Sequence, residues 1–361
     1  MSMPTVIRSL SVEPLNIPLN SSFGIAGGMQ EMAHNLLITI ELGDGTQGFG
    51  EAAPFAAFNG ETQEMAHVAV ETARSTIEGA DVREWRRLAG VLHQRIGPVG
   101  SAQCAIETAM LDALTRSNGL PLWAFFGGVS TSLETDMTIT TGSVEHAVTS
   151  AYAIVERGIR TIKIKVGSGD LNLDIERVIA IQNAAPSSPL ILDGNGGFSA
   201  DGALQLLAIL DERNASPILF EQPVKKDDWE GLRQVTQWGG VPVAADETVS
   251  SSADALRVIQ ERAAQVINIK LMKCGIVEAL DIAALCRAAR LRLMVGGMVE
   301  SILTMTVSAC FAAGLGGFHY IDLDTPMFMA ENPFNGGFQQ SGGLLTLDHI
   351  VAGHGVTPAS G

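Results

Sequence analysis

The part of the sequence that most restricts the possible folds is residues 136–321, where one pattern repeats along the chain. Short apolar segments that often end in a polar residue alternate with segments of helical periodicity. Such alternation is typical of βαβ units with parallel strands. Repeats of near-uniform length fit a closed (β/α)8 barrel of the TIM type better than an open sheet. The predicted strands are residues 136–140, 161–166, 189–193, 217–221, 241–246, 265–270, 291–295 and 318–321.

The residues before this repeat predict a separate α+β domain. Gly43-Asp44-Gly45 joins two candidate strands and is a strong hairpin signal. Residues 20–28 are rich in Ser and Gly, which predicts a mobile loop. The candidate strands are residues 6–15, 36–42 and 46–50, and the candidate helices are residues 61–77, 83–95 and 101–116.

These patterns divide the chain into three parts. Residues 1–128 form a predicted α+β capping domain, and residues 129–325 form the predicted barrel. Residues 326–361 contain many Gly and Asn but no further βα unit. We therefore expect this C-terminal segment to return to the cap and complete it.

Composition limits the partners that such a protein can have. Of 361 residues, 46% are hydrophobic and 17% are charged, and the formal net charge of −16 argues against nucleic acid and anionic membranes as partners. The start of the chain lacks the pattern of a signal peptide, and no run reaches the roughly 18 apolar residues of a spanning helix. The four cysteines lack the spacing of a zinc site. We expect a cytoplasmic homo-oligomer with no nucleic-acid or membrane partner.

Ionisable residues stand at the ends of consecutive predicted strands, from the second to the sixth. The active sites of (β/α)8 barrels lie at the C-terminal ends of the strands. Because these residues recur about once per βα unit, we expect them at a similar height around the barrel mouth. They are Lys163, Lys165, Asp193, Glu221, Asp246 and Lys270.

Three of these residues are acids that come from neighbouring strands: Asp193, Glu221 and Asp246. Three carboxylates that converge on one point repel one another unless a cation lies between them. Ligation by oxygen alone suits a hard ion, and Mg²⁺ is satisfied by carboxylates, water and substrate oxygens. Each acid by itself is better explained as a helix cap or as the partner of a lysine. For three acids in register we predict a metal site, with one Mg²⁺ per subunit.

Lysines flank this predicted metal site. Side chains alternate along a strand, so Lys163 and Lys165 point to the same face. Two neighbouring ammonium groups disfavour each other's charge, which favours a neutral lysine that can act as a base, although lysines on an exposed strand would simply face water. A metal between two lysines is similar to the arrangement of the enolase superfamily, which implies that Lys165 and Lys270 remove a proton beside a carboxylate on one side and return it on the other. That reaction is a racemisation or an epimerisation.

Five motifs at these strand ends resemble the muconate-lactonizing branch of the enolase superfamily. The resemblance extends over nearly the whole chain, including Gly48-Phe49-Gly50-Glu51-Ala52 and Pro121-Leu122-Trp123 of the cap. Met294-Val295-Gly296-Gly297 lacks the histidine that the mandelate racemase branch has at the seventh strand end. The motifs are Thr161-Ile162-Lys163-Ile164-Lys165, Leu192-Asp193-Gly194-Asn195, Phe220-Glu221-Gln222-Pro223, Ala245-Asp246-Glu247 and Asn268-Ile269-Lys270-Leu271-Met272-Lys273-Cys274-Gly275.

Within this branch, the end of the eighth strand distinguishes the reactions. Asp322-Leu323-Asp324 is similar to the Asp-x-Asp motif with which dipeptide epimerases hold the α-ammonium group of the substrate. Two carboxylates on one face make a site for a cation. The resemblance therefore implies that an L,L-dipeptide is epimerised through an enediolate at the α-carbon of its C-terminal residue, with Lys163 among the substrate-binding residues.

Specificity is expected to come from the cap and from the end of the seventh strand. Ala-Glu epimerases of the family carry an arginine in the cap loop, where this chain has Gly28. Acidic residues around the pocket favour a dipeptide with a cationic Lys or Arg side chain, and apolar residues favour a hydrophobic one as the second choice. The acidic candidates are Glu51, Glu300 and Asp322, and the apolar ones are Phe23, Ile25, Phe55, Phe58 and Met298.

Two other functional classes remain open at this point. An N-succinylamino acid racemase or an o-succinylbenzoate synthase of the same branch would use the same barrel, but its substrates offer no ammonium group to Asp322 and Asp324. A non-catalytic binding protein on this fold is hard to reconcile with a complete set of site residues.

Overall fold

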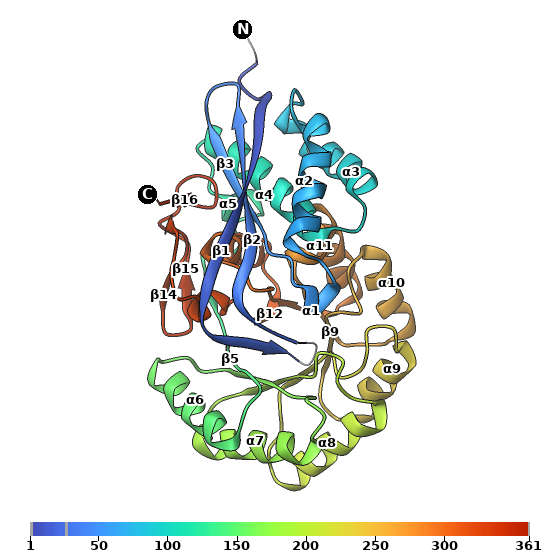
Figure 1. The fold of residues 1–361 in the computed structure, drawn as a ribbon. Coiled ribbons are helices and arrows are strands. Elements are labelled where there is room, and N and C mark those ends of the chain that lie inside the picture. The colour runs from blue at the N-terminus through green and yellow to red at the C-terminus, as the bar shows by residue number, and fades with distance from the viewer. Residues whose placement is uncertain (1–2, 26–27, 360–361) are drawn as a thin grey trace.

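The chain forms a barrel that carries a smaller domain over its mouth (Figure 1). The structure is a computed structural model that describes residues 3–25 and 28–359, without the side chains of residues 21–29. No helix in the described ranges is long and apolar enough to cross a membrane. The helices are α1 (Ala56–Asn59), α2 (Gln63–Ile77), η1 (Val82–Glu84), α3 (Trp85–Ile96), α4 (Gly100–Ser117), α5 (Leu122–Phe125), α6 (Val144–Glu156), α7 (Leu171–Ala184), α8 (Ala200–Glu212), α9 (Trp229–Trp238), α10 (Ser252–Glu261), α11 (Leu271–Ala289), α12 (Ile302–Leu315) and η2 (Thr325–Phe328).

The strands form one large parallel sheet and three small antiparallel ones. The strands are β1 (Ile7–Ile25), β2 (Gly28–Leu42), β3 (Gln47–Ala52), β4 (Ser132–Glu134), β5 (Met137–Ile139), β6 (Ile162–Lys165), β7 (Leu190–Asp193), β8 (Leu219–Glu221), β9 (Val243–Ala245), β10 (Val266–Ile269), β11 (Arg292–Val295), β12 (Phe318–Ile321), β13 (Phe334–Gly336), β14 (Gln339–Ser341), β15 (Leu344–Thr346) and β16 (Val356–Pro358).

The cap consists of the antiparallel sheet β1-β2-β3 packed on helices α2 to α4. Helix α4 lies so close to β3 that only glycine fits on the strand at the contact. A Cβ atom at Gly50 would lie 2.0 Å from the backbone oxygen of Ala105, and one at Gly48 would lie 2.3 Å from that of Ala109. Thr62 caps α2 by accepting a hydrogen bond from the backbone N–H of Met65. These contacts confirm the predicted α+β cap.

The first two strands are longer than the sequence predicts. Residues 20–28 are predicted to form a mobile loop, but β1 continues to Ile25 and β2 begins at Gly28. The backbones of the two strands pair as far as Ile25 and Gly28, past an irregularity between Pro18 and Phe23. Pairing with the facing strand therefore compensates for the Ser- and Gly-rich composition. Figure 1 shows this long ribbon reaching from the cap down to the barrel.

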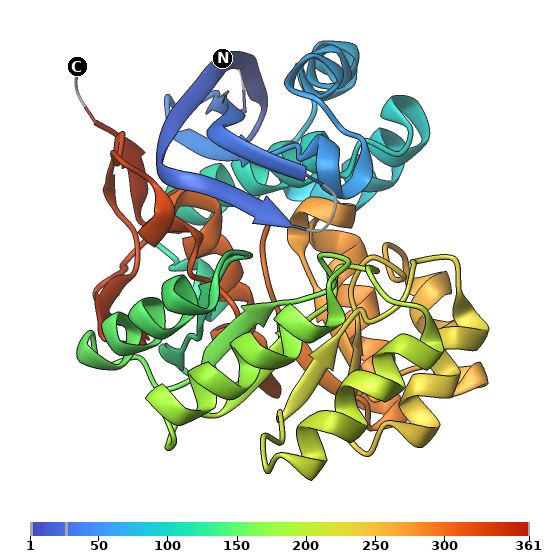
Figure 2. The same cartoon turned by 60° about the horizontal axis from the view of Figure 1, so that its bottom comes forward.

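The barrel confirms the predicted βα alternation. Strands β5 to β12 are neighbours in sequence order in one parallel sheet, and helices surround them (Figure 2). The backbone N–H of Asp136 donates to the carbonyl of Ile321 at 2.9 Å, which joins the two ends of the sheet. Five buried apolar side chains pack together inside the barrel, each two residues before a residue at the mouth. They are Ile191, Leu219, Ala244, Val266 and Met294.

The C-terminal segment completes the cap, as predicted. Strand β15 pairs with β4, and β13 pairs with β16 beside the cap. The backbone N–H of Leu122 donates to the carbonyl of Gly353, and the buried His354 ring lies 3.0 Å from the carbonyl of Phe49. The end of the chain therefore joins the first sheet to the barrel.

Candidate active site

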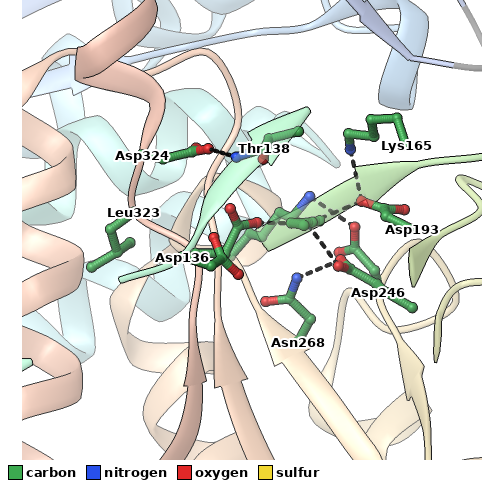
Figure 3. A network of polar contacts seen from close by, with 12 residues as sticks. Asp136, Thr138, Lys165, Asp193, Asp246, Asn268, Leu323 and Asp324 are labelled. Carbon is green, nitrogen blue, oxygen red and sulfur yellow. Dashed lines mark hydrogen bonds and ion pairs between the residues drawn. The ribbon is translucent and has the colours of Figure 1, made fainter. Parts of the chain in front are cut away.

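The predicted strand-end residues meet at the C-terminal mouth of the barrel, beneath the cap. Lys165, Asp193 and Glu221 are direct partners across β6, β7 and β8, so their side chains lie at one level. Asp246 follows β9, and Lys270 follows β10. These five residues are at most 5% exposed. The network appears in Figure 3, where Lys165, Asp193 and Asp246 are labelled.

The three predicted metal ligands are each paired with a lysine ammonium group. Lys163 Nζ lies 3.0 Å from Asp193 and 2.7 Å from Glu221 Oε2, and Lys270 Nζ lies 2.7 Å from Asp246 Oδ2. Neither Glu221 Oε2 nor Asp246 Oδ2 accepts a hydrogen bond of good geometry, although both are buried. Three fully buried carboxylates with oxygens in reach of cationic groups are a donor set that suits a hard divalent cation. The residues present therefore fit a magnesium site.

Further polar groups orient these carboxylates. Asn268 Nδ2 donates to Glu221 Oε1 at 2.7 Å, and Lys273 Nζ donates to Asp246 Oδ1 at 2.9 Å. Asn195, at φ 40°, accepts a hydrogen bond from Lys165 Nζ at 3.0 Å. Such contacts fix the direction of a ligand and tune its basicity. The carboxylates are therefore held in place by the protein itself.

The structure corrects one expectation about the lysines. The proximity of two ammonium groups predicts a neutral lysine, but carboxylates surround these groups. Burial works to lower the pKa of Lys163, yet the charges of Asp193, Asp322 and Glu221 raise that pKa well above its usual value. Burial also works to lower the pKa of Lys270, and Asp246 and Glu221 raise it. The surrounding carboxylates therefore favour the charged form of both lysines.

The predicted ammonium-binding pair lies on the other side of Lys163. Lys163 Nζ donates to Asp322 Oδ2 at 2.7 Å, and Asp324 Oδ2 accepts the backbone N–H of Thr138 at 2.7 Å. Burial and the neighbouring Asp322 charge raise the pKa of Asp324 to about 6. Asp136 is a third acid here, and the pattern of ionisable residues at strand ends does not include it because it precedes a strand instead of following one. Carboxylate oxygens of Asp136, Asp322 and Asp324 all lie within 4.8 Å of one another.

A small pocket of about 30 Å³ connects these groups. Its apolar wall contains Phe55, Phe58 and Met298, and the Phe58 ring centroid lies 4.6 Å from Lys270 Nζ. Its polar lining comes from both candidate bases and both candidate ammonium ligands, namely Lys165, Lys270, Asp322 and Asp324. Three predicted specificity residues, Phe23, Ile25 and Gly28, belong to residues 21–29, for which the structure describes the backbone in part but not the side chains.

Two of the predicted acidic pocket residues have structural roles instead. Glu51 is fully buried and accepts hydrogen bonds from Asn35 Nδ2 at 2.7 Å and from Ser301 Oγ at 2.6 Å. It also accepts the backbone N–H of Ser301, the residue that caps α12. Glu300 accepts the backbone N–H of Met298, and burial raises the pKa of Glu300 to about 8. Neither Glu51 nor Glu300 is among the residues that line this pocket in the described structure.

We expect Glu51→Ala to destabilise the fold, because Glu51 joins β3 of the cap to the N-terminus of α12. The substitution leaves buried donors of Asn35 and Ser301 without an acceptor, at a cost of about 3 kcal/mol. Urea unfolding measures this loss, and Glu13→Ala on the exposed face of β1 is the matched control, expected within about 0.5 kcal/mol of wild type. Equal stability of the two variants would contradict a structural role for Glu51.

Comparison with known protein families places both parts of the chain. Residues 7–127 match the model of the mandelate racemase / muconate lactonizing enzyme N-terminal domain. Residues 146–360 match the model described as enolase C-terminal domain-like. The two matches together span the cap, the barrel and the C-terminal segment.

Similar proteins include enzymes with a stated activity. An aromatic dipeptide epimerase from Herpetosiphon aurantiacus is 52% identical over 99% of this chain and 100% of that protein. A solved structure of a mandelate racemase/muconate lactonizing enzyme from Roseiflexus sp. is 60% identical, with a TM-score of 0.96 over the full length of both chains. A dipeptide epimerase from Enterococcus faecalis, solved with Mg and the dipeptide L-Leu-L-Tyr, is 32% identical, with a TM-score of 0.94 over 98% of this chain and 99% of that one.

Proposed function

This chain belongs to the mandelate racemase / muconate lactonizing enzyme family of the enolase superfamily and is an isomerase of the dipeptide epimerase type, and from that premise we propose its substrates and mechanism. The substrates are L,L-dipeptides whose C-terminal residue has a hydrophobic or aromatic side chain. The reaction inverts the α-carbon of that residue by moving one proton. Lys165 and Lys270 are the two catalytic residues.

The observation that carries the proposal is the placement of the two lysines on opposite sides of the acidic cluster. Lys165 is on β6 and Lys270 follows β10, four strands further along an eight-stranded barrel. Lys165 Nζ lies 2.7 Å from Asp193, and Lys270 Nζ lies 2.7 Å from Asp246. A substrate carbon held above these carboxylates therefore has one amine on each face. This arrangement supports removal of a proton from one face and its return to the other.

The remaining residues bind and orient the dipeptide. Asp193, Glu221 and Asp246 are the proposed ligands of Mg²⁺, which when bound supplies positive charge to stabilise the developing enediolate. Asp322 and Asp324 accept hydrogen bonds from the α-ammonium group of the substrate. Lys163 lies between the two sets of acids, where its ammonium group can hold a substrate carboxylate oxygen. One lysine takes the α-proton, and the opposite one donates a proton to the other face.

We propose a hydrophobic side chain on the C-terminal residue of the substrate, in place of the cationic side chain that the sequence favours. That preference depended on Glu51, Glu300 and Asp322. Glu51 and Glu300 are buried and are not among the lining residues, and Asp322 lines the pocket but pairs with Lys163. Phe55, Phe58 and Met298 remain as the apolar wall. The names of the Herpetosiphon relative and of the Enterococcus complex with L-Leu-L-Tyr support the same choice. No arginine occurs between Leu10 and Ala73 to pair with a glutamate side chain.

We expect L-Ala-L-Phe and L-Ala-L-Tyr to be epimerised faster than L-Ala-L-Lys and L-Ala-L-Glu by about one to two decades in kcat/KM. The reason is that a charged side chain loses its hydration against an apolar wall without gaining a partner. The measurement is uptake of α-deuterium from heavy water, read by mass spectrometry across a dipeptide panel with Mg²⁺ present. N-acetyl-L-Ala-L-Phe is the control, because it offers the same side chains but no ammonium group.

Other outcomes of this panel point to other functions. A preference for L-Ala-L-Lys would restore the cationic specificity. Faster turnover of N-succinylamino acids than of free dipeptides would identify an N-succinylamino acid racemase and would remove the proposed role of Asp322 and Asp324.

A further inference from the structure

Asp136 lies beneath the proposed ammonium site and has no role in the reaction as described above. The residue precedes β5, two positions before Thr138, so both side chains point into the barrel. In Figure 3, the labelled Asp136 and Thr138 lie along the same segment, with Asp324 beside Thr138. Asp136 and Asp324 are both 2% exposed, but Asp324 lines the pocket together with Thr138 and Asp322, and Asp136 does not. Asp136 therefore lies behind the residues that line the pocket.

The three neighbouring acids differ in their partners. Asp322 accepts the ammonium group of Lys163, and Asp324 accepts the backbone N–H of Thr138. Neither carboxylate oxygen of Asp136 accepts a hydrogen bond from any described residue, although both are buried. Lys163 Nζ is already in contact with three other carboxylates, those of Asp193, Glu221 and Asp322. The site therefore holds one more carboxyl group than its donors can satisfy.

A proton resolves this imbalance. A buried carboxylate without any donor is unfavourable by several kcal/mol, and two adjacent carboxyl groups avoid this cost by sharing a proton. A neutral Asp136 has an O–H group to donate, and carboxylate oxygens of Asp322 and Asp324 lie within 4.8 Å. Burial and the charges of Asp322 and Asp324 also raise the pKa of Asp136 well above its usual value, which favours the neutral acid.

We propose that Asp136 is a positioning residue that remains a neutral carboxylic acid and donates a hydrogen bond to Asp322. The backbone N–H of Asp136 donates to the carbonyl of Ile321, and this hydrogen bond holds Asp136 beside Asp322, the next residue in the chain after Ile321. Asp322 is thereby fixed between Lys163 below and the substrate ammonium group above. With Asp136 neutral, the three acids together carry two negative charges instead of three. The link to the ammonium group rests on the proposed function, whereas the protonation of Asp136 does not.

The protonation is tested on the enzyme without substrate, at pH 8. We expect the infrared spectrum of wild type minus Asp136→Asn to show the carbonyl band of a protonated carboxylic acid, and ¹³C-labelled aspartate to shift that band. The Asp324→Asn variant is the control and should keep the band. A spectrum without this difference would show that Asp136 is ionised and would overturn the proposal.

The positioning role is tested by kinetics. Asp136→Asn keeps a donor of similar shape, so kcat/KM for L-Ala-L-Phe should stay within about 3-fold of wild type. Asp136→Leu removes the donor and should raise KM about 10- to 100-fold with little change in kcat, because the lost bond is made to a charged group. The activity of Asp136→Leu on the N-acetylated dipeptide should equal that of wild type, because this substrate has no ammonium group. A general packing defect would instead lower the activity on both substrates. A wild-type KM in Asp136→Leu, or a loss in Asp136→Asn as large as in Asp136→Leu, would refute the role.

The two tests separate this inference from the proposed function. A wild-type enzyme that turns over no dipeptide would refute the proposed function and the link to the ammonium group. The infrared experiment would still decide whether Asp136 carries a proton. If Asp136→Leu does not fold, the infrared comparison and the kinetics of Asp136→Asn still give a definite answer.

Discussion

Lys165→Ala and Lys270→Ala should each abolish epimerisation while each keeps exchange at the α-carbon of one stereoisomer. Each variant retains an amine on one face only, so it can exchange the proton of the epimer that presents its α-hydrogen to that face. It cannot deliver a proton to the other face. General base catalysis by a positioned side chain contributes roughly 10² to 10⁴ in rate, so the conversion of one epimer to the other should fall by at least about 10²-fold. The measurement is deuterium incorporation into each separated epimer in heavy water.

Lys225→Ala is the matched control, since Lys225 is exposed on the loop after β8 and pairs with none of the site carboxylates in the described structure. Its epimerisation rate should equal that of wild type. The two-base mechanism would be wrong if one lysine variant still interconverted the epimers at the wild-type rate, or if both variants exchanged the same epimer. Loss of exchange with both epimers in both variants would point to binding roles for the lysines.

Much of the barrel could be predicted because its geometry follows from local patterns. A βα unit has a nearly constant length, so a polar residue that recurs once per unit falls at the same end of each strand. Lys165, Asp193 and Glu221 are indeed direct cross-strand partners. The inward positions two residues earlier on β7 and β8, Ile191 and Leu219, are apolar and close the barrel below them, whereas on β6 this position is Lys163. A period of two along each strand therefore separates the buried core from the polar mouth.

The specificity pocket could not be predicted in the same way, because its residues meet only through tertiary contacts. Glu51 and Ser301 are far apart in sequence, and only their packing shows that Glu51 holds the start of α12. The extension of β1 and β2 past residue 20 depends on pairing between two strands and not on their own composition. Asp136 precedes a strand, so a search of strand ends passes over it. Asp136 is two residues before Thr138, so the sequence alone indicates that their side chains lie on the same face of the strand.

Removal of divalent metal should abolish activity without unfolding the protein, and Mg²⁺ should restore it. Each candidate ligand already has an ammonium partner, Lys163 on Asp193 and Glu221 and Lys270 on Asp246. These pairs offset the buried negative charge, so we expect the far-ultraviolet circular dichroism of the protein in excess chelator to remain that of the folded protein. Activity should nevertheless fall by at least about 10³-fold, since stabilisation of the developing charge by a metal contributes several kcal/mol.

Binding of the metal can be followed apart from activity. Added Mg²⁺ should raise the melting temperature of the wild type, because a ligand that binds only the folded state stabilises it. Asp193→Asn, Glu221→Gln and Asp246→Asn should each remove that increase together with the activity. Asp201→Asn on the first turn of α8, away from the site, is the control and should keep both. Full activity in excess chelator would exclude the metal from the reaction, whereas an increase in melting temperature that persists in all three variants would place the ion at other residues. The pairing of these carboxylates with lysines relates the change in melting temperature to the change in activity. A cation held by Asp193, Glu221 and Asp246 would compete with the ammonium groups of Lys163 and Lys270 for the same oxygens, and its charge would favour the neutral form of a neighbouring lysine.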